Sequence, residues 1–278
     1  MTRILVMTDS TCDLPPETIA RYDICVVPLY IHIGKAEYQD GIDITREQFY
    51  KGLPGYKNFP TTAVSSHHKF KAVYDGLSDD GATEILSIHI SEALSAVINV
   101  ARLAAQETSS AAVSVFDSRQ LSLGTGFLVE TAGRMASAGQ AMGDILKASK
   151  AQILRSHVFA ALDTLEFLKR SGRMNGFMAN VGGLLQIKPI LTMHDGIPGT
   201  EKVRTHKRAM ARLVEMLEAS GSLERLAIVH THAPERVAEL RSLAAHLLPN
   251  EEILMAYITP VIGAHIGPGA VGFAVVSA

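Results

Sequence analysis

Short aliphatic runs alternate with helix-forming segments along the first half of this 278-residue chain, and this alternation constrains the fold more than any other feature. The runs at residues 4–7, 24–29, 84–90 and 112–116 are dominated by Ile, Leu and Val. Such runs are typical of strands buried on both faces of a parallel sheet, and parallel strands need crossovers, usually helices, between them. We therefore expect an α/β fold whose N-terminal part is a mostly parallel sheet with helices on both faces.

The pattern changes near residue 153. Beyond it, a glycine-punctuated stretch is followed by helical segments near residues 205 and 238 and by strand-like runs at 226–230, 253–259 and 271–276. This second half predicts another α/β unit, with a mixed or antiparallel sheet. We expect two domains, at residues 1–153 and 154–278.

Composition and charge exclude several classes of protein. The formal charge of −2 and the pI near 6.6 supply no basic field, so the sequence predicts no nucleic-acid partner.

Cys12 and Cys25 have no metal-ligand spacing, which favours a reducing, cytoplasmic location. No segment approaches the roughly 20 apolar residues of a membrane span, so we expect no stable membrane insertion, while transient membrane contact stays compatible with the sequence. Hydrophobic residues reach 47% but aromatic ones only 6%, so the core is aliphatic and suited to line a lipid tunnel.

Two helix starts are predicted from local sequence. Thr45 followed by Gln48 forms a capping-box pattern. Residues 91–106 have helical periodicity, with Ser91 as the N-cap. Ser91 and Ser95 would then lie near helix N-terminal amides, where the helix dipole favours a carboxylate.

Other polar residues could also hold an anion. Thr61 and Thr62 fall in a segment at residues 60–66 that reads as a loop, where their hydroxyls can donate a hydrogen bond. His265 is surrounded by glycines, which allow the backbone to approach a ligand closely. A histidine there can bind a carboxylate, act as a base or satisfy buried backbone groups, and spacing does not choose between these roles.

Three functions are compatible with these residues taken alone. A small-molecule carrier is the first, and a structural protein without a ligand is another. The third is a metal-dependent hydrolase, in which His230 and His232, two residues apart after a strand, would bind the metal. His67 and His68 precede a predicted helix and are expected to face solvent. A serine hydrolase and a nucleotide-binding protein have less support, because neither GxSxG nor a phosphate-binding glycine motif occurs.

Eight short blocks follow one another along nearly the whole chain. They are Thr8-Asp-Ser-Thr, Val27-Pro-Leu, Tyr38-Gln-Asp-Gly-Ile-Asp-Ile-Thr, Ser87-Ile-His-Ile-Ser, Phe116-Asp-Ser, Leu168-Lys-Arg-Ser-Gly-Arg, Ile187-Lys-Pro-Ile-Leu and His265-Ile-Gly-Pro-Gly. Together they closely resemble the DegV family of fatty-acid-binding proteins. The resemblance implies one long-chain fatty acid, palmitate-like with about 14 to 18 carbons, in a tunnel between or along two α/β domains.

The resemblance also implies which residues hold the ligand. Thr61, Ser95 and His265 match family positions that bind the carboxylate at the domain junction, and Thr62 and Ser91 are further candidates. It implies no catalytic residue, metal or cofactor, so the chain would be a carrier and not an enzyme.

A partner is implied as well. Some members of the family present the bound acid to a separate ATP-dependent fatty acid kinase, which forms an acyl phosphate for bacterial phospholipid metabolism. Arg173 matches the position implicated in docking that kinase, and Arg170 is its neighbour. The chain departs from the family pattern at Ala63, Ala96 and Val97, where the family has polar residues or glycine, and these changes put the acyl-chain preference in question.

Overall fold

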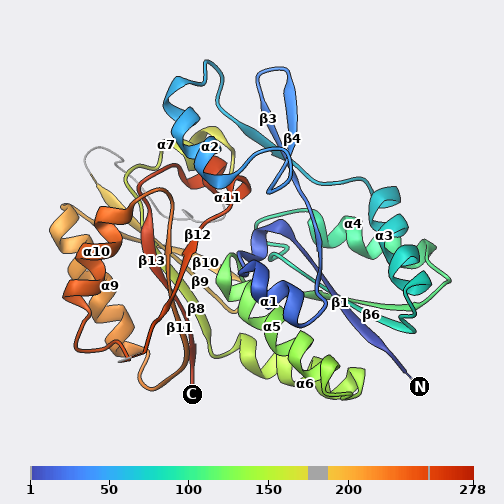
Figure 1. Cartoon of the computed structure of the whole chain (residues 1–278). Coiled ribbons are helices and arrows are strands. Elements are labelled where there is room, and N and C mark those ends of the chain that lie inside the picture. The colour runs from blue at the N-terminus through green and yellow to red at the C-terminus, as the bar shows by residue number, and fades with distance from the viewer. Residues whose placement is uncertain (1, 175–186, 250) are drawn as a thin grey trace.

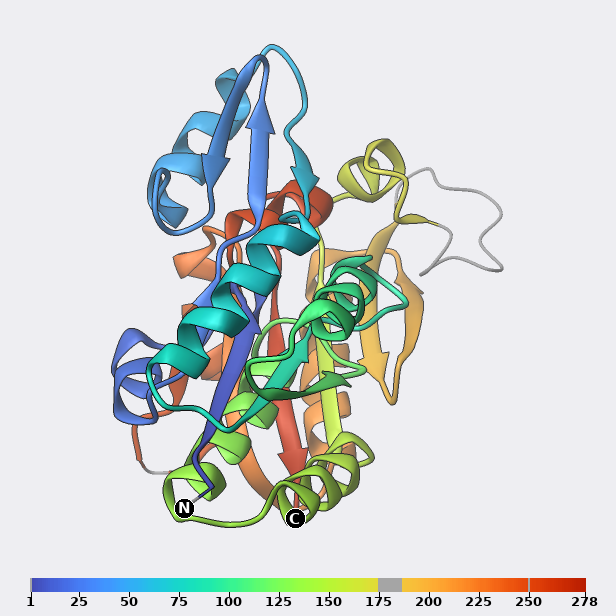
Figure 2. The ribbon, with the colours of Figure 1, turned by 90° about the vertical axis from the view of Figure 1, so that its right-hand side faces the viewer.

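The computed structural model describes residues 2–174, 187–249 and 251–278, which form three sheets surrounded by helices (Figures 1 and 2). The N-terminal part contains a four-stranded parallel sheet in the order β2-β1-β6-β7. Its strands are β1 (Ile4–Asp9), β2 (Cys25–Val27), β6 (Glu84–His89) and β7 (Ala112–Asp117). The predicted α/β class with a parallel N-terminal sheet is confirmed.

Both faces of this sheet are buried, which is why its strands appear in the sequence as apolar runs. Along β1, Val6 packs in the cluster that contains Phe127, whereas Leu5 and Met7 pack in the cluster that contains Phe70. The first cluster lies under α5, and the second lies under α3 and α4. The helical segments described with this sheet are η1 (Ser10–Cys12), α1 (Pro16–Arg21), α3 (His67–Asp79), α4 (Val97–Glu107), α5 (Leu123–Ser137) and α6 (Met142–Ile153).

A small antiparallel sheet extends from the same part, at the top in Figures 1 and 2. Its order is β4-β3-β5, with β3 (Tyr30–Ile33), β4 (Ala36–Gln39) and β5 (Thr61–Ala63), and α2 (Arg46–Gly52) and η2 (Leu53–Gly55) lie between β4 and β5 in the chain. The predicted capping box is confirmed at the start of α2, because Thr45 and Gln48 each accept the other's backbone amide. The prediction of a loop at residues 60–66 is wrong at β5, which pairs with β3. A three-residue strand is too short to show an apolar pattern of its own.

The C-terminal part contains a six-stranded mixed sheet in the order β10-β9-β8-β13-β11-β12, as predicted. Among its strands only β11 and β12 pair in parallel. The strands are β8 (Ser156–Ala161), β9 (Lys188–His194), β10 (Ile197–Val203), β11 (Leu223–His230), β12 (Leu254–Tyr257) and β13 (Val271–Ser277). The helices described with it are α7 (Glu166–Arg170), α9 (His206–Ala219), α10 (Pro234–Leu243) and α11 (Pro260–Ile266).

Helix α5 packs against both large sheets. One buried cluster runs from Leu86 in β6 through Phe127 in α5 to Val158 in β8 and Ala274 in β13. Close packing of α5 requires glycine, since a Cβ on Gly126 would lie 2.4 Å from the carbonyl oxygen of Cys12. The chain passes from the four-stranded sheet to the six-stranded sheet between α6 and β8, near the proposed boundary at residue 153. The buried cluster around α5 nevertheless joins the two parts.

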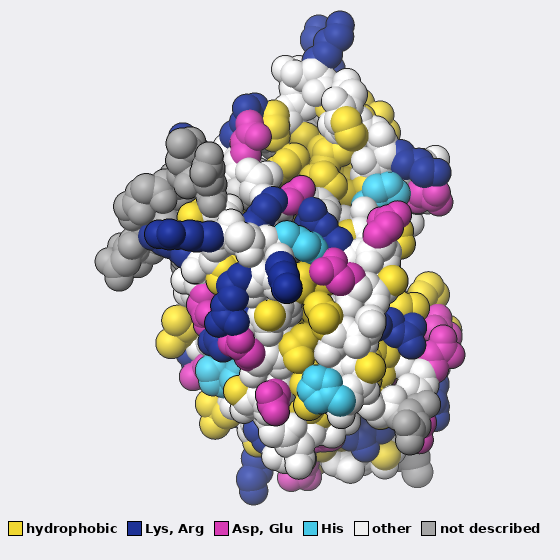
Figure 3. Space-filling model, turned by 90° about the vertical axis from the view of Figure 1, so that its left-hand side faces the viewer, with side chains coloured by type: hydrophobic (Ala, Val, Ile, Leu, Met, Phe, Trp, Pro, Cys, Tyr) yellow, Lys and Arg dark blue, Asp and Glu magenta, His cyan; other side chains and the backbone are white. Residues whose placement is uncertain are grey.

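The face formed by α9 and α10 carries basic and acidic side chains in alternation and shows no area of a single charge (Figure 3). Arg208 pairs with Glu215 within α9, and Arg212 of α9 pairs with Glu201 of β10. None of the described helices has the length and apolar character needed to cross a membrane.

Central strand β13 leaves no room for a side chain at Gly272. A Cβ there would lie 2.0 Å from the carbonyl oxygen of Phe159. We expect Gly272→Ala to lower the free energy of unfolding by about 3 kcal/mol, at the upper end of overpacking effects. Gly76 in α3 is exposed, with nothing within 4 Å of its added Cβ, so Gly76→Ala should raise stability by about 0.5–1 kcal/mol. Urea unfolding measures the change in the free energy of unfolding in both variants. Changes of the same sign and size would contradict this prediction.

Candidate functional site

A pocket lies between the C-terminal ends of the parallel strands and the six-stranded sheet. The N-terminal part contributes β5, the segment after β6 and the start of α5, and the C-terminal part contributes β8, β9 and α11. Its wall is mainly aliphatic and includes Leu29, Ile90, Val158, Leu191, Val229 and Ile262. A concave apolar site with few polar groups is typical of a small-molecule pocket.

Two polar side chains of the pocket contact each other. The Oγ1 atom of Thr62 lies 2.9 Å from Nε2 of His265, which is near the end of α11. The other ring nitrogen, Nδ1, is buried and has no hydrogen-bond partner in the described part of the protein. Burial, together with the nearby charge of Arg173, lowers the pKa of His265 to about 4, so the imidazole is neutral near pH 7.

The contact between Thr62 and His265 always leaves one hydrogen unused. If Nδ1 carries the ring hydrogen, Nε2 accepts from the Thr62 hydroxyl and the Nδ1 hydrogen is free. If Nε2 carries it, the ring donates to Thr62 Oγ1 and the hydroxyl hydrogen of Thr62 is free instead. Either tautomer therefore leaves one donor of the pair without a partner in the described part of the protein.

Ser95 lines the same pocket, in the turn before α4. Its Oγ accepts a hydrogen bond from the amide of Val97 at 3.4 Å, which leaves the hydroxyl proton available. The predicted helix start at Ser91 is wrong, because α4 begins at Val97. The Ser91 hydroxyl accepts from the amide of Ala93, and such local bonds compete with a helical backbone.

The structure separates the remaining candidates by their position. Thr61, next to Thr62 on β5, is exposed and is not part of the described pocket wall. Ser91 is buried and also lies outside that wall. Ala63 and Ala96, two of the departures from the family pattern, line the pocket, whereas Val97 is buried.

Two further hydroxyls of the pocket wall are already committed as donors. Thr11 donates to Asp9, and Ser122 donates to Asp13 at 2.6 Å. A hydroxyl has a single proton, so neither can also donate to a ligand. No motif in the sequence marks Ser122, and only its contact with Asp13, 109 residues away, identifies its role.

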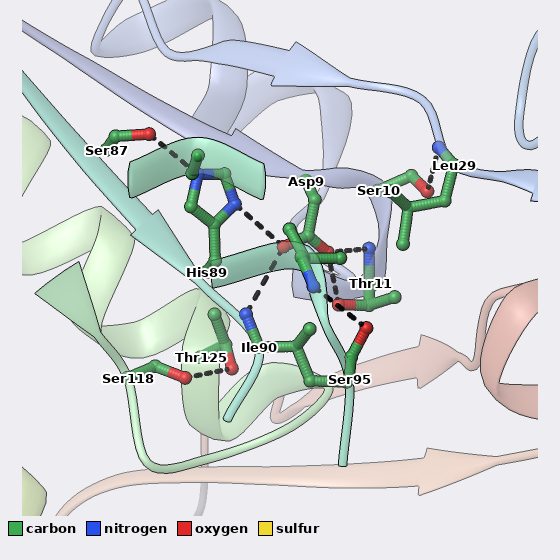
Figure 4. A network of polar contacts seen from close by, with 12 residues as sticks. Asp9, Ser10, Thr11, Leu29, Ser87, His89, Ile90, Ser95, Ser118 and Thr125 are labelled. Carbon is green, nitrogen blue, oxygen red and sulfur yellow. Dashed lines mark hydrogen bonds and ion pairs between the residues drawn. The ribbon is translucent and has the colours of Figure 1, made fainter. Parts of the chain in front are cut away.

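Ser87, His89 and Asp9 form a Ser-His-Asp arrangement of side chains (Figure 4). Nε2 of His89 lies 2.6 Å from the Ser87 hydroxyl, and Nδ1 lies 2.9 Å from a carboxylate oxygen of Asp9. The Ser87 hydroxyl also contacts the hydroxyl of Tyr74 at 2.9 Å. Sequence reasoning missed this group, although Ser87 and His89 are two apart on a strand and therefore share one face.

These three residues cannot act as a hydrolytic triad in this conformation. Ser87, His89 and Asp9 are 0% exposed, and none belongs to the described pocket wall. Burial opposes the charge of Asp9, but the hydrogen bond and charge of His89 keep the pKa of its carboxyl below the usual range. The group is therefore a buried polar network that joins the end of β1 to β6, and the Asp9 carboxylate also accepts the amide of Ile90 at 3.2 Å.

The two histidines considered for a metal-dependent hydrolase contact an aromatic residue. Tyr257 stacks on His230 with 5.0 Å between ring centroids, and its hydroxyl lies 2.6 Å from Nδ1 of His232. Nδ1 of His230 accepts the amide of Ala233 at 3.3 Å. Within the described ranges, no third His, Cys, Asp or Glu groups with the two imidazoles at ligating distance. No contact of these residues favours the hydrolase.

The two arginines matched to kinase docking occupy different environments. Arg173 lines the pocket and is exposed at its edge. Arg170, at the end of α7, pairs with Glu166, and its guanidinium lies 3.9 Å from the ring centroid of Phe59. Positive charge is thus placed on the surface next to the pocket.

Comparisons with known proteins agree with one another. A family model described as an uncharacterised protein of the DegV family matches residues 3–278. A DegV domain-containing protein from Listeria innocua is 34% identical, with 97% of each chain covered. The structure of a DegV family protein from Thermus thermophilus, described as fatty acid binding, is 35% identical with a TM-score of 0.90 over the whole of both chains. DegV from Bacillus subtilis, described as a fatty acid binding protein, is 28% identical with a TM-score of 0.92, again over both whole chains.

The half-buried imidazole of His265 should make stability depend on pH. Its pKa is about 4 in the folded chain and about 6.5 in the unfolded chain, so the unfolded chain alone binds the proton between these values. Stability is therefore lost as the pH falls from 6.5 towards 4. When the pH is lowered from 7 to 5, we expect the free energy of unfolding to fall by about 2 kcal/mol more in the native protein than in His265→Gln. Urea unfolding at both pH values measures the difference. Replacing exposed His246 by Gln is the control, and an equal effect of both substitutions would contradict the assignment.

Proposed function

The chain belongs to the DegV family, and on that basis we propose that it binds one long-chain fatty acid, with the carboxylate beside Thr62, Ser95 and His265. The observation that carries the proposal is an aliphatic pocket in which an unpartnered imidazole nitrogen and free hydroxyl donors are available. The structural relatives from Thermus thermophilus and Bacillus subtilis are described as fatty acid binding, which supports the same ligand class.

Burial of the acyl chain would supply most of the affinity. About 14 methylenes of a palmitate-like acid, at roughly 0.8 kcal/mol each, contribute about 11 kcal/mol before the costs of association and ordering. The pocket wall suits such a chain because its side chains are aliphatic and nearly free of aromatic rings. Hydrophobic burial does not fix the direction of the chain, however, so the polar groups decide its orientation.

The carboxylate needs hydrogen-bond donors wherever it is removed from water, because a buried anion without them is costly. The Thr62–His265 pair offers one proton and Ser95 offers another. Thr11 and Ser122 present no free proton, so a carboxylate is disfavoured near them. Arg173 adds positive charge at the same pocket. Thr62 takes the role that the family motif suggests for Thr61.

We further propose that the chain is a carrier that presents its acid to a separate ATP-dependent kinase. The sequence contains no phosphate-cradling glycine motif, so the nucleotide would be bound by the partner. Arg170 and Arg173 place cations beside the pocket, where a complementary acidic surface could dock. We propose that the preferred fatty acid has about 14 to 18 carbons.

Native mass spectrometry of freshly purified protein tests the ligand. We expect one released fatty acid per chain. Thr62→Val should weaken its binding roughly tenfold or more, because a hydrogen bond to a charged group contributes about 1.5–3 kcal/mol. Thr61→Val is a matched control on the adjacent, exposed position and should leave affinity unchanged. A protein that binds none of the added fatty acids would refute the proposed function. Equal losses of affinity in Thr62→Val and Thr61→Val would refute the position proposed for the carboxylate.

A kinase assay tests the docking surface. With added fatty acid kinase and Mg-ATP, Arg170→Ala should slow acyl phosphate formation several-fold while fatty acid affinity stays unchanged, because Arg170 is outside the described pocket wall. Arg208→Ala is the control, since Arg208 has a similar side-chain exposure (54% against 50%) and also pairs with a glutamate. An equal rate in the native protein and Arg170→Ala would remove Arg170 from the docking surface.

A further inference from the structure

Two imidazoles and a carboxylate meet at one end of the α3–α4 helix pair, and none of the three side chains belongs to the described pocket wall. His67, His68 and Glu107 each offer a ligating atom, and these atoms lie within 4.8 Å of one another. The Nε2 atom of His67 is 3.8 Å from a carboxylate oxygen of Glu107, and the rings of His67 and His68 are 3.9 Å apart between centroids. All three side chains reach the surface.

The helices hold this group in place. His67 and His68 are the first two residues of α3, which Ser66 caps by accepting the amide of Lys69 at 3.3 Å. Glu107 is the last residue of α4. The helices run antiparallel, because Tyr74 contacts Ala101 in the middle of the pair while His67 meets Glu107 at its end. Buried Phe70, Tyr74, Ala101 and Ala104 fix the packing beneath the group.

The electrostatics at this position tolerate a cation. The positive end of the α3 dipole disfavours a cation, but the negative end of the α4 dipole lies beside it and opposes that effect. Glu107 adds a full negative charge. The cations that follow on α3 are engaged elsewhere, because Lys69 contacts Tyr30 and Lys71 pairs with Asp75 at 2.6 Å.

We propose that His67, His68 and Glu107 bind one divalent transition-metal ion of the zinc type. Two imidazole nitrogens and one carboxylate oxygen are ligands that Zn²⁺ accepts, whereas Mg²⁺ and Ca²⁺ require mostly oxygen ligands. A tetrahedral Zn²⁺ with bonds of about 2.1 Å needs its ligand atoms roughly 3.4 Å apart, close to the observed 3.8 Å between His67 and Glu107. Small rotations of exposed side chains close the remaining gap, and water completes the coordination.

Such an ion would join α3 to α4. Residues 64–66 connect the site to β5, whose Thr62 lines the pocket, so the metal would also steady that segment. The proposal goes beyond fatty acid binding and does not depend on it. Histidine binds metal only as the neutral ring, so protons compete with the ion and acidic pH weakens binding.

Calorimetric titration of ZnCl₂ into chelator-treated full-length protein tests the site. We expect one saturable Zn²⁺ per chain, a rise in melting temperature with Zn²⁺, and no comparable effect of MgCl₂. His67→Ala and Glu107→Gln should each weaken Zn²⁺ binding by more than about tenfold, because even outer-shell partners contribute about 10- to 100-fold.

The chain offers a matched control in another His–Glu contact. Nε2 of His206 lies 2.8 Å from Glu239, and no further imidazole, thiolate or carboxylate joins them among the residues described. His206→Ala should leave Zn²⁺ affinity unchanged. The proposal is overturned if no saturable Zn²⁺ site is found, if Glu107→Gln binds as the native protein does, or if His206→Ala weakens binding as much as His67→Ala.

Discussion

The buried carboxylate of Asp13 is the interaction on which the arrangement of the pocket depends. It accepts hydrogen bonds from the Ser122 hydroxyl at 2.6 Å and the Thr259 amide at 2.8 Å, and it pairs with Arg46 at 3.1 Å. These partners belong to the starts of α5, α11 and α2, so one side chain joins both parts of the chain. Burial raises the pKa of Asp13 to about 6 in spite of Arg46, which shows that the interaction is held against a desolvation cost.

The position of His265 follows from that contact. Thr259 directly precedes α11, and His265 lies near the other end of the same short helix. Once the amide of Thr259 is held by Asp13, the helix directs the imidazole towards Thr62 on β5. The small antiparallel sheet and α11 therefore meet at the pocket although they are about 200 residues apart in sequence.

Burial also decides which polar groups can serve a ligand. Asp9, His89 and Ser87 have distances compatible with nucleophilic catalysis, yet they are 0% exposed and serve to join β1 and β6. Thr62, Ser95 and His265 line the pocket, and their mutual and local contacts leave protons unused. Accessibility and free donors, more than the identity of the residues, separate a binding site from a structural network.

Sequence by itself determined the local features and the fold class. Apolar runs identified the buried parallel strands, Thr45 and Gln48 identified the start of α2, and the ordered motifs identified the family. These signals are local because they depend on side-chain periodicity and on hydrogen bonds within one turn. Only the tertiary structure decided that Thr62 and not Thr61 reaches the pocket, because this depends on the pairing of β5 with β3 and on the contact of Thr62 with His265, 203 residues away. It also decided the contacts of His89 with Asp9 and of His67 with Glu107, because residues 40 or 80 positions apart meet only through the packing of whole helices and sheets.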